Sequence, residues 1–298
     1  MTHIPDAAKP LVEFKAEKAF FVGIDSDGCA FDTMEIKHKE CFCPEIIRHW
    51  NLQAVSKYAR EAAEFVNLYS KWRGINRWPA LMMVLDLLRE RAEVQARGVE
   101  IPWANKVRDF IASGFALSDS GLKKYMAEHP DPELEQALGW TTAVNQQIGN
   151  MVHGVPPFPF VRESLQMMKA EADLMVVSAT PTEALTREWK EHDIARYVRL
   201  ICGQEMGKKE DHLALAAKGK YIDGHVLMIG DAPGDLKAAR SIGALFFPIN
   251  PGEEEASWER FYREGYARFL GGTYAGAYEQ ALIADFDKRL PDTPPWKK

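Results

Sequence analysis

Two aspartates, Asp25 and Asp27, stand one residue apart in the stretch FFVGIDSDGCAFDT, residues 20–33, directly after an apolar run. Ionised carboxylates that leave water are costly unless they are paired with a cation or bound to a metal. Acids of this type can bind a hard divalent cation, attack an electrophile or transfer a proton. We therefore expect the two aspartates to belong to a chemical site rather than to the interior of a strand.

Further reactive groups follow other short apolar runs of the chain. They are Ser178, one lysine of the pair Lys208 and Lys209, and two more acids, Asp231 and Asp235. In an open parallel sheet, ligands collect beyond the carboxyl ends of the strands, where several loops converge. If the apolar runs are strands of one such sheet, all of these groups lie near one edge of it.

The runs and the segments between them predict the elements that position these groups. The runs that predict strands are AFFVGID (19–25), ADLMVVS (172–178), RLIC (199–202), HVLMIGD (225–231) and ALFFPI (244–249). The amphipathic stretches that predict helices between the later strands are FVRESLQMMKAEA (160–172), PTEALTREWKEH (181–192) and GDLKAARSIG (234–243). This alternation predicts an α/β fold, with a parallel sheet covered by helices on both faces.

No strand pattern occurs from about Met34 to Val155. Segments 55–72 and 79–98 carry apolar residues at helical spacing instead. We expect a helical domain, residues 34–155, inserted into a core of residues 1–33 and 156–298. The glycine and prolines of HGVPPFPF (153–160) suit the return linker. After the last strand, residues 250–269 predict a turn and a helix, with a further helix through Asp285.

Composition limits the class of protein. The chain has 298 residues, 46% of them apolar, and a net charge of −6, which gives no global attraction for nucleic acid or an anionic membrane. We find no signal peptide and no apolar segment long enough to span a membrane. Four irregularly spaced cysteines favour reduced thiols over a disulfide framework. We expect a soluble, cytoplasmic protein.

The strand-end groups, taken in order, resemble the motifs of the haloacid dehalogenase superfamily of phosphohydrolases. The first motif is matched by DSDG (25–28), the second by Ser178 in VVSATP, the third by a lysine in GKKEDHL (207–213) and the fourth by GDAPGD (230–235). The resemblance covers residues 19–33 and 156–249. It implies a Rossmann-like core, and the inserted segment stands where the family carries its helical cap.

The resemblance implies that Mg²⁺ is the cofactor. Asp25 and Asp231 would bind it through their side chains and Asp27 through its backbone carbonyl, while Asp235 would support the metal and its waters. Mg²⁺ prefers oxygen ligands of this kind, and it would offset the charge of a phosphate dianion. The alternative is that Asp231 and Asp235 only begin and cap a helix, because acids are favoured at a helix N-terminus.

The resemblance also assigns the reacting groups. Asp25 would be the nucleophile that forms an aspartyl phosphate, and Asp27 would be the general acid and base. A lysine would reduce the repulsion between Asp25 and the phosphate. We favour Lys209 over Lys208, because a lysine precedes a helix by this spacing in family variants.

Three residues are expected to bind the phosphate. Gly28 lacks a Cβ and lets backbone amides approach the phosphoryl oxygens. Ser178 would donate its hydroxyl, with help from the amide of Ala179. Ser178 could instead cap the helix that begins near Pro181.

Basic and aromatic residues in the inserted segment are candidates for substrate selection. The run YSKWRGINRWPAL (69–81) places Arg73 and Arg77 beside two tryptophans, where they could bind a second anionic group or stack on a ring. The competing interpretation is a basic turn in solvent, with the tryptophans packed inside the domain. Lys37 and His38, just after the first motif, are comparable candidates.

The sequence therefore predicts a Mg²⁺-dependent phosphatase that acts on a small phosphorylated metabolite. An acid at Asp27 argues against relatives that cleave carbon–halogen or carbon–phosphorus bonds, which lack one at this position. The alternatives are a phosphomutase of the same superfamily and a ligand-binding module that has kept the fold without turnover. The sequence identifies neither the substrate nor the oligomeric state.

Overall fold

The computed structural model describes residues 5–297, which form two compact units. The core unit comprises the chain up to Thr33 and Gly154–Arg289. The inserted unit comprises Met34–His153 and the chain from Leu290 onward. The sequence placed residues 290–298 in the core, whereas the described part of this segment groups with the inserted unit.

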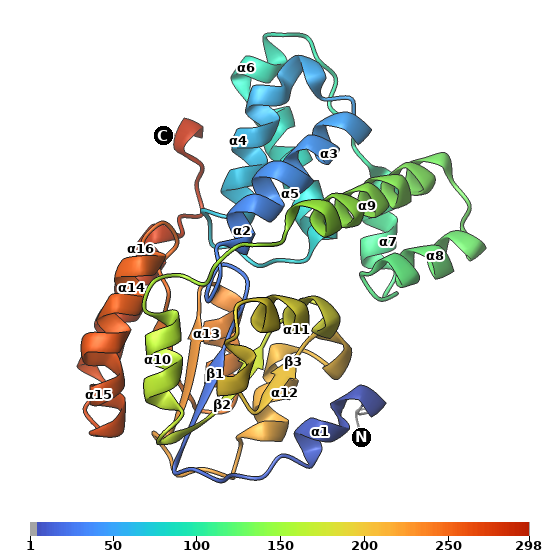
Figure 1. Ribbon diagram of the computed structural model, residues 1–298. Coiled ribbons are helices and arrows are strands. Elements are labelled where there is room, and N and C mark those ends of the chain that lie inside the picture. Colours follow the sequence, from blue (N-terminus) through green and yellow to red (C-terminus); the bar gives the residue numbers. More distant parts are fainter. Residues whose placement is uncertain (1–4, 298) are drawn as a thin grey trace. The chain divides into compact units, whose positions relative to one another are not determined.

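The core unit is built on a five-stranded sheet in the order β3-β2-β1-β4-β5, in which all neighbours are parallel (Figure 1). The strands are β1 (Phe20–Ile24), β2 (Ala172–Val177), β3 (Leu200–Cys202), β4 (Val226–Gly230) and β5 (Leu245–Pro248). Each of the five predicted strands is confirmed. Their near-continuous apolar sequences follow from burial on both faces, because helices cover each side of a parallel sheet.

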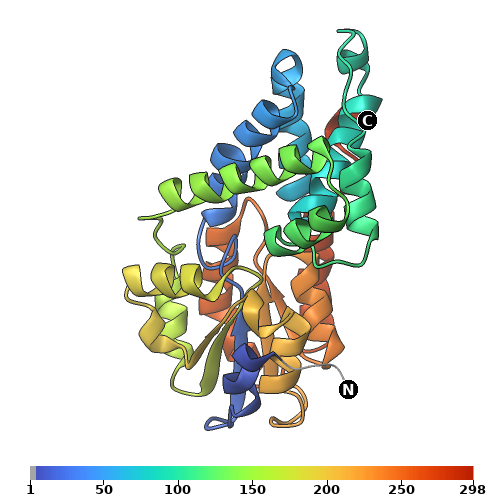
Figure 2. The same ribbon diagram turned by 90° about the vertical axis from the view of Figure 1, so that its right-hand side faces the viewer.

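Helices of the core unit flank both faces of this sheet (Figure 2). They are α1 (Lys9–Val12), α10 (Val161–Met168), α11 (Thr182–Glu191), α12 (Lys209–Ala216), α13 (Pro233–Ser241), α14 (Glu254–Arg260), α15 (Tyr266–Leu270) and α16 (Ala277–Arg289). The π-helical segment Phe261–Gly265 joins α14 to α15. The helices predicted at 160–172, 181–192 and 234–243 are thereby confirmed.

Alternate residues of each strand face opposite helical layers. Val22 and Ile24 of β1 belong to a buried cluster with apolar residues of α10, α11, α14 and α15. Gly23, between them, faces the other layer, where a Cβ would lie 3.1 Å from the Leu213 side chain of α12. The glycine therefore allows α12 to pack closely against β1, and α12 begins with Lys209.

The regular secondary structure in the described part of the inserted unit consists of helices. Its helices are α2 (Thr33–Ile36), which starts at the boundary, α3 (Cys43–His49), α4 (Ser56–Asn67), α5 (Arg77–Glu90), α6 (Ala92–Gln95), α7 (Asn105–Ala112), α8 (Asp119–Glu128) and α9 (Pro132–Met151), with a π-helical segment at Lys37–Phe42. Short 3-10 turns of the two units are Asp6–Ala8, Gln53–Val55, Ala195–Tyr197, Gln204–Met206 and Pro295–Lys297.

Aromatic packing and helix caps stabilise the inserted unit. Trp78 is fully buried, with its ring centroid 5.5 Å from those of Phe110 and Trp140. The longest helix, α9, starts with Pro132 after Asp131, whose carboxylate accepts a hydrogen bond from Glu133 N at 2.8 Å. A carboxylate at this position satisfies an amide that has no partner within the helix.

The C-terminal segment packs on the inserted unit through a tryptophan. The Trp296 ring lies 5.8 Å from the Phe65 ring and 4.5 Å from the Arg91 guanidinium carbon. Lys71 N donates to Pro291 O at 3.3 Å, which anchors the start of the segment. These contacts explain why the segment groups with the inserted unit.

Two further findings concern the chain as a whole. In the part of the sequence that the structure describes, no helix combines the length and apolar character that crossing a membrane requires. The four cysteines, Cys29, Cys41, Cys43 and Cys202, are free and buried.

Candidate active site

The carboxyl ends of β1, β2 and β4 hold the predicted site residues of the core unit at one edge of the sheet. Asp25 directly follows β1, and its backbone N–H still donates to Ile229 O of β4 at 2.9 Å. Ser178 directly follows β2, and its N–H donates to Cys202 O at the end of β3. The sheet ladder therefore continues into the first site residues and fixes their backbones.

Three carboxylates converge at this edge. Asp25, Asp231 and Asp235 are 4%, 1% and 0% exposed, and one oxygen from each lies within 4.8 Å of the others. Buried carboxylates so close together repel one another and lose hydration, so they require a compensating cation. Oxygen donors of this kind suit a hard divalent cation, and the cluster fits such an ion.

Lys209 is the cation that the protein itself supplies to this cluster. Its Nζ lies 2.8 Å from Asp25 Oδ2 and 2.6 Å from Asp235 Oδ1. Burial alone would lower the pKa of the Lys209 ammonium, but the carboxylates of Asp235 and Asp25 outweigh it and raise the pKa above its usual value. Lys209 is therefore a fixed positive charge between the two acids.

Lys208, the alternative to Lys209, lies outside the cluster. It is the exposed residue that precedes α12, and its backbone N–H donates to Asp211 Oδ2 at 2.9 Å. Of the two lysines, the structure brings Lys209 to the acids.

Asp235 is placed by the first turn of α13 and by a glycine on β4. Its Oδ2 accepts a hydrogen bond from Ala232 N at 3.1 Å, so it caps the helix as well as contacting Lys209. A Cβ on Gly230 would lie 2.4 Å from the Asp235 side chain, and only glycine permits this approach. Burial raises the pKa of the Asp235 carboxyl to about 6. Attraction by Lys209 lowers this pKa, whereas repulsion from Asp25 raises it further.

Asp27 does not share the three-carboxylate cluster. Its carboxylate instead accepts two hydroxyl hydrogen bonds, one from Thr33 Oγ1 to Oδ1 and one of 2.5 Å from Thr180 Oγ1 to Oδ2. The two acids of the DSDG motif thus occupy different environments, the first beside a lysine and the second between two threonines.

From Ser26 to Phe31, around Asp27, the backbone turns sharply. Ser26 O accepts hydrogen bonds from the amides of Ala30 and Phe31, and Gly28 has a φ of +74°. The Gly28 N–H donates to Phe31 O at 2.8 Å. The left-handed conformation accounts for a glycine at this position, because residues with a Cβ rarely adopt it.

Ser178 and Ala179 lie in the loop after β2. Ser178 is buried, and its Oγ accepts a weak hydrogen bond from Thr180 N at 3.3 Å. The first amide of α11 instead donates to Glu205 Oε2, from Thr182 N at 3.0 Å. Ser178 is therefore not the cap of α11, and Ala179 is exposed next to it.

The two predicted arginines lie within the inserted unit and contact its interior. Arg73 is 4% exposed, and its NH1 donates to Leu68 O at 2.9 Å. Arg77 NH1 donates to Thr141 Oγ1 at 2.7 Å and to Asn145 Oδ1 at 2.8 Å, which joins α5 to α9. Burial lowers the pKa of Arg77. Neither arginine is part of a solvent-exposed turn.

Lys37 and His38 begin the π-helical segment of the same unit. Lys37 is 9% exposed, and the His38 ring stacks on the Phe42 ring with centroids 4.7 Å apart.

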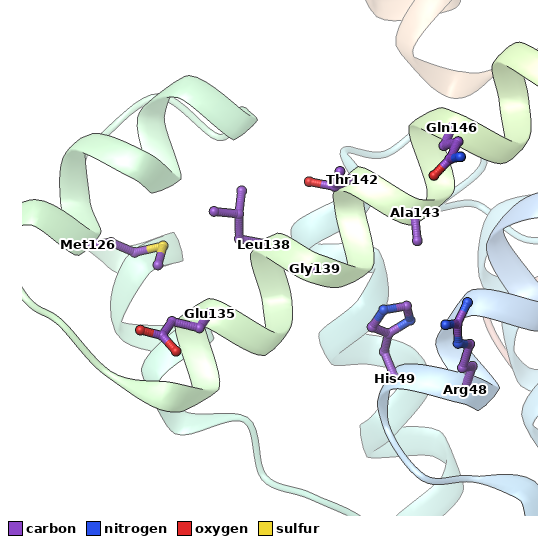
Figure 3. A pocket seen from close by; sticks show the side chains of 9 residues that line it. All are labelled: Arg48, His49, Met126, Glu135, Leu138, Gly139, Thr142, Ala143 and Gln146. Carbon is purple, nitrogen blue, oxygen red and sulfur yellow. The ribbon is translucent and has the colours of Figure 1, made fainter.

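A pocket of about 440 Å³ lies between α3, α8 and α9 of the inserted unit (Figure 3). His49 and Arg48 of α3 line one side, opposite Gly139 of α9, where a Cβ would lie 3.8 Å from the His49 ring. His49 Nδ1 lies 3.2 Å from Glu45 Oε2. This pocket contains none of the residues predicted for the site.

Fold and site together define a Rossmann-like α/β protein with a buried carboxylate and lysine centre at the carboxyl edge of its parallel sheet. The family model for haloacid dehalogenase-like hydrolases matches residues 112–249. The matched range includes Ser178, Lys209, Asp231 and Asp235, while the DSDG motif precedes it. This match confirms the predicted resemblance to the haloacid dehalogenase-like hydrolases for that part of the chain.

Solved structures of low sequence identity are also similar. They include a predicted phosphoglycolate phosphatase from Haemophilus somnus 129PT, with 16% identity over 78% of this chain and 86% of that one and a TM-score of 0.45. A HAD-superfamily hydrolase of subfamily IA, variant 1, from Geobacter sulfurreducens PCA has 16% identity over 79% and 89%, with a TM-score of 0.39. A haloacid dehalogenase-like family hydrolase from Xanthomonas campestris has 11% identity over 87% and 97%, with a TM-score of 0.44. No curated protein matches the chain.

Proposed function

We propose that this protein is a Mg²⁺-dependent phosphatase that hydrolyses a small phosphorylated metabolite through an aspartyl phosphate on Asp25. The observation that carries this proposal is the buried contact of Lys209 with Asp25 and Asp235, within a cluster that also includes Asp231. A carboxylate that attacks a phosphate dianion must have its own charge and that of the phosphate compensated. Lys209 and a cation site beside the nucleophile would supply that compensation.

The charges of the cluster support a divalent cation. Asp25, Asp231 and Asp235 bring three carboxylates together in one buried site, and oxygen donors of this kind suit a hard divalent cation. Asp25, Asp231 and Asp235 would hold Mg²⁺, with the backbone carbonyl of Asp27 as a further ligand that the family resemblance implies. When bound, Mg²⁺ would withdraw charge from the phosphoryl oxygens and orient the phosphate.

The chain's own residues would then perform two displacements. In the first, a carboxylate oxygen of Asp25 bonds to phosphorus, the phosphorus–ester oxygen bond breaks, and the leaving oxygen takes a proton from Asp27. In the second, water gives a proton to Asp27 and attacks phosphorus, which releases inorganic phosphate and restores the Asp25 carboxylate. Dividing the reaction in this way replaces one difficult step with two easier ones.

The remaining predicted residues would bind and select the substrate. The Ser178 hydroxyl and the Ala179 amide, which adjoin the cluster's edge of the sheet, would donate to phosphoryl oxygens. Gly28, in the turn that follows Asp27, would let backbone amides approach the phosphoryl oxygens. The inserted unit would act as the cap that selects the substrate.

Phosphate release tests this function directly. The protein should release phosphate from an aryl phosphate in Mg²⁺, lose this activity in excess chelator and regain it when Mg²⁺ is restored. Ca²⁺, with a larger and looser coordination shell, should support little turnover. Full activity in chelator would exclude the mechanism.

A screen of phosphorylated metabolites would then identify the substrate. Transfer of the phosphoryl group to a second hydroxyl of the substrate, without release of phosphate, would indicate a phosphomutase. Binding without either reaction would indicate a ligand-binding module.

A further inference from the structure

Both oxygens of the Asp27 carboxylate are held by threonine hydroxyls from different parts of the core unit. Thr33 lies six residues further along the chain and donates to Oδ1. Thr180 lies in the loop after β2 and donates to Oδ2 at 2.5 Å. The Thr180 contact therefore joins the loop after β1 to the loop that carries Ser178.

Thr180 is itself fixed by its backbone. Its N–H donates to Ser178 Oγ at 3.3 Å, and its carbonyl accepts a hydrogen bond from Gln204 N at 3.1 Å. Gly203 permits this packing, because a Cβ there would lie 2.5 Å from Thr180 O. The hydroxyl is thus presented to Asp27 from a backbone that is anchored on both sides.

We propose that Thr180 is a positioning residue for Asp27, an inference that rests on the phosphatase function proposed above. A carboxylate that transfers a proton must hold the correct rotamer while its protonation changes. A hydroxyl suits this task, because it donates to a carboxylate and accepts from a carboxylic acid. Thr180 can thus keep contact with Oδ2 whether Asp27 carries a proton or not.

Thr182 provides a matched control two residues away. Thr182 is the first residue of α11, and its hydroxyl donates to Glu205 Oε2 at 2.8 Å rather than to Asp27. Thr180→Val and Thr182→Val each remove one hydroxyl without changing side-chain volume, whereas Thr180→Ser retains the hydroxyl. All variants should have the melting temperature of the wild type before their rates are compared.

The test uses aryl phosphates whose phenols differ in acidity, because a weakly acidic phenol needs its leaving oxygen protonated. Phosphoenzyme formation is measured in Mg²⁺ by rapid quenching and intact-protein mass. Thr180→Val should form it about tenfold to a hundredfold more slowly with the least acidic phenol, the loss expected for one hydrogen bond to a charged group. The loss should shrink as the phenol becomes more acidic. Thr180→Ser and Thr182→Val should resemble the wild type.

The outcomes separate this inference from the function on which it rests. If the wild type forms no phosphoenzyme, the proposed function fails and the role of Thr180 fails with it. If the wild type forms it on Asp25 but Thr180→Val matches Thr182→Val, or loses equally with every phenol, only the role of Thr180 is wrong. A loss that depends on the phenol and is reversed in Thr180→Ser supports it.

Discussion

Lys209 and Asp25, far apart in sequence, form a largely buried ion pair in which Nζ lies 2.8 Å from Oδ2. The pair exists because α12 packs closely over Gly23 of β1, the strand that Asp25 follows. The same ammonium contacts Asp235, so one side chain links the first and last motifs of the site. Buried charges are tolerated in a fold when they are paired in this way, and removing one partner leaves the others uncompensated.

The first prediction concerns this lysine. Lys209→Met should lower turnover of an aryl phosphate by about a hundredfold or more, as when other charge-stabilising groups are removed from an active site. Lys208→Met, at the exposed neighbouring position, should retain nearly full activity. Steady-state phosphate release, measured for both variants at the same Mg²⁺ concentration, tests these two expectations. The reverse order of effects would make Lys208 the functional lysine.

The sequence was sufficient to predict the sheet because each strand is a short apolar run that ends in a polar or small residue. Burial on both faces of a parallel sheet requires this pattern, and β1, β2 and β4 each place a candidate group at their carboxyl ends. The order of those groups along the chain is the basis of the family resemblance. Their spacing along the chain did not distinguish Lys208 from Lys209, because which lysine reaches the acids depends on where α12 begins.

Other features depend on contacts that leave no pattern in the sequence. Thr33 and Thr180 were not predicted as site residues, although both stand beside motif residues. A hydroxyl that meets a distant carboxylate has no characteristic spacing. Similarly, the sequence analysis assigned residues 156–298 to the core, whereas Trp296 contacts Phe65 and Arg91 of the inserted unit.

A second prediction concerns the packing role of Arg77. Its guanidinium donates to Thr141 and Asn145 and lies 5.1 Å from the Phe42 ring. Arg77→Ala should therefore lower the free energy of unfolding by about 1–3 kcal/mol, because the buried Thr141 hydroxyl loses its donor. Urea unfolding of the variant and the wild type measures this change.

The same variant tests the predicted role of Arg77 in substrate selection. A side chain that only packs should affect turnover of the true substrate and of an aryl phosphate to the same extent. A selective loss with the true substrate would instead assign Arg77 a contact with the non-reacting part of that substrate. Arg73→Ala distinguishes the same alternatives for Arg73.

A third prediction concerns pH and the buried His212 of α12. Burial lowers the pKa of its imidazole to about 4, below the usual value of 6.5. The unfolded chain therefore binds a proton here before the native chain does, and stability falls as the pH drops from about 6.5 toward 4. Between pH 7 and pH 5, the unfolding free energy of the wild type should fall by about 2 kcal/mol more than that of His212→Leu.

Urea unfolding at both pH values measures this difference. His129→Leu is the control, because the His129 side chain is exposed whereas that of His212 is buried. An unchanged pH dependence in His212→Leu would show that the native protein binds a proton at His212 as readily as the unfolded chain.

The last prediction separates the two acids of the DSDG motif, whose side chains are identical but whose surroundings differ. Asp25 is paired with Lys209, whereas Asp27 accepts hydrogen bonds from two threonines. Asp25→Asn removes the proposed nucleophile, so no phosphoenzyme should form with any substrate. Asp27→Asn retains the nucleophile but removes the proton donor and the base that activates water, a contribution of about a hundredfold to ten-thousandfold in general acid–base catalysis.

With the phosphate of an acidic phenol, whose leaving group needs little protonation, the first step should survive the loss of Asp27 better than the second. An acid-stable, base-labile phosphoenzyme should therefore accumulate in Asp27→Asn and be missing in Asp25→Asn, as measured by intact-protein mass after rapid quenching. Phosphorylation of Asp25→Asn at the wild-type rate would show that another residue is the nucleophile. Rapid hydrolysis of the phosphoenzyme in Asp27→Asn would show that another group activates the water, because the Asp27 carboxylate is then absent.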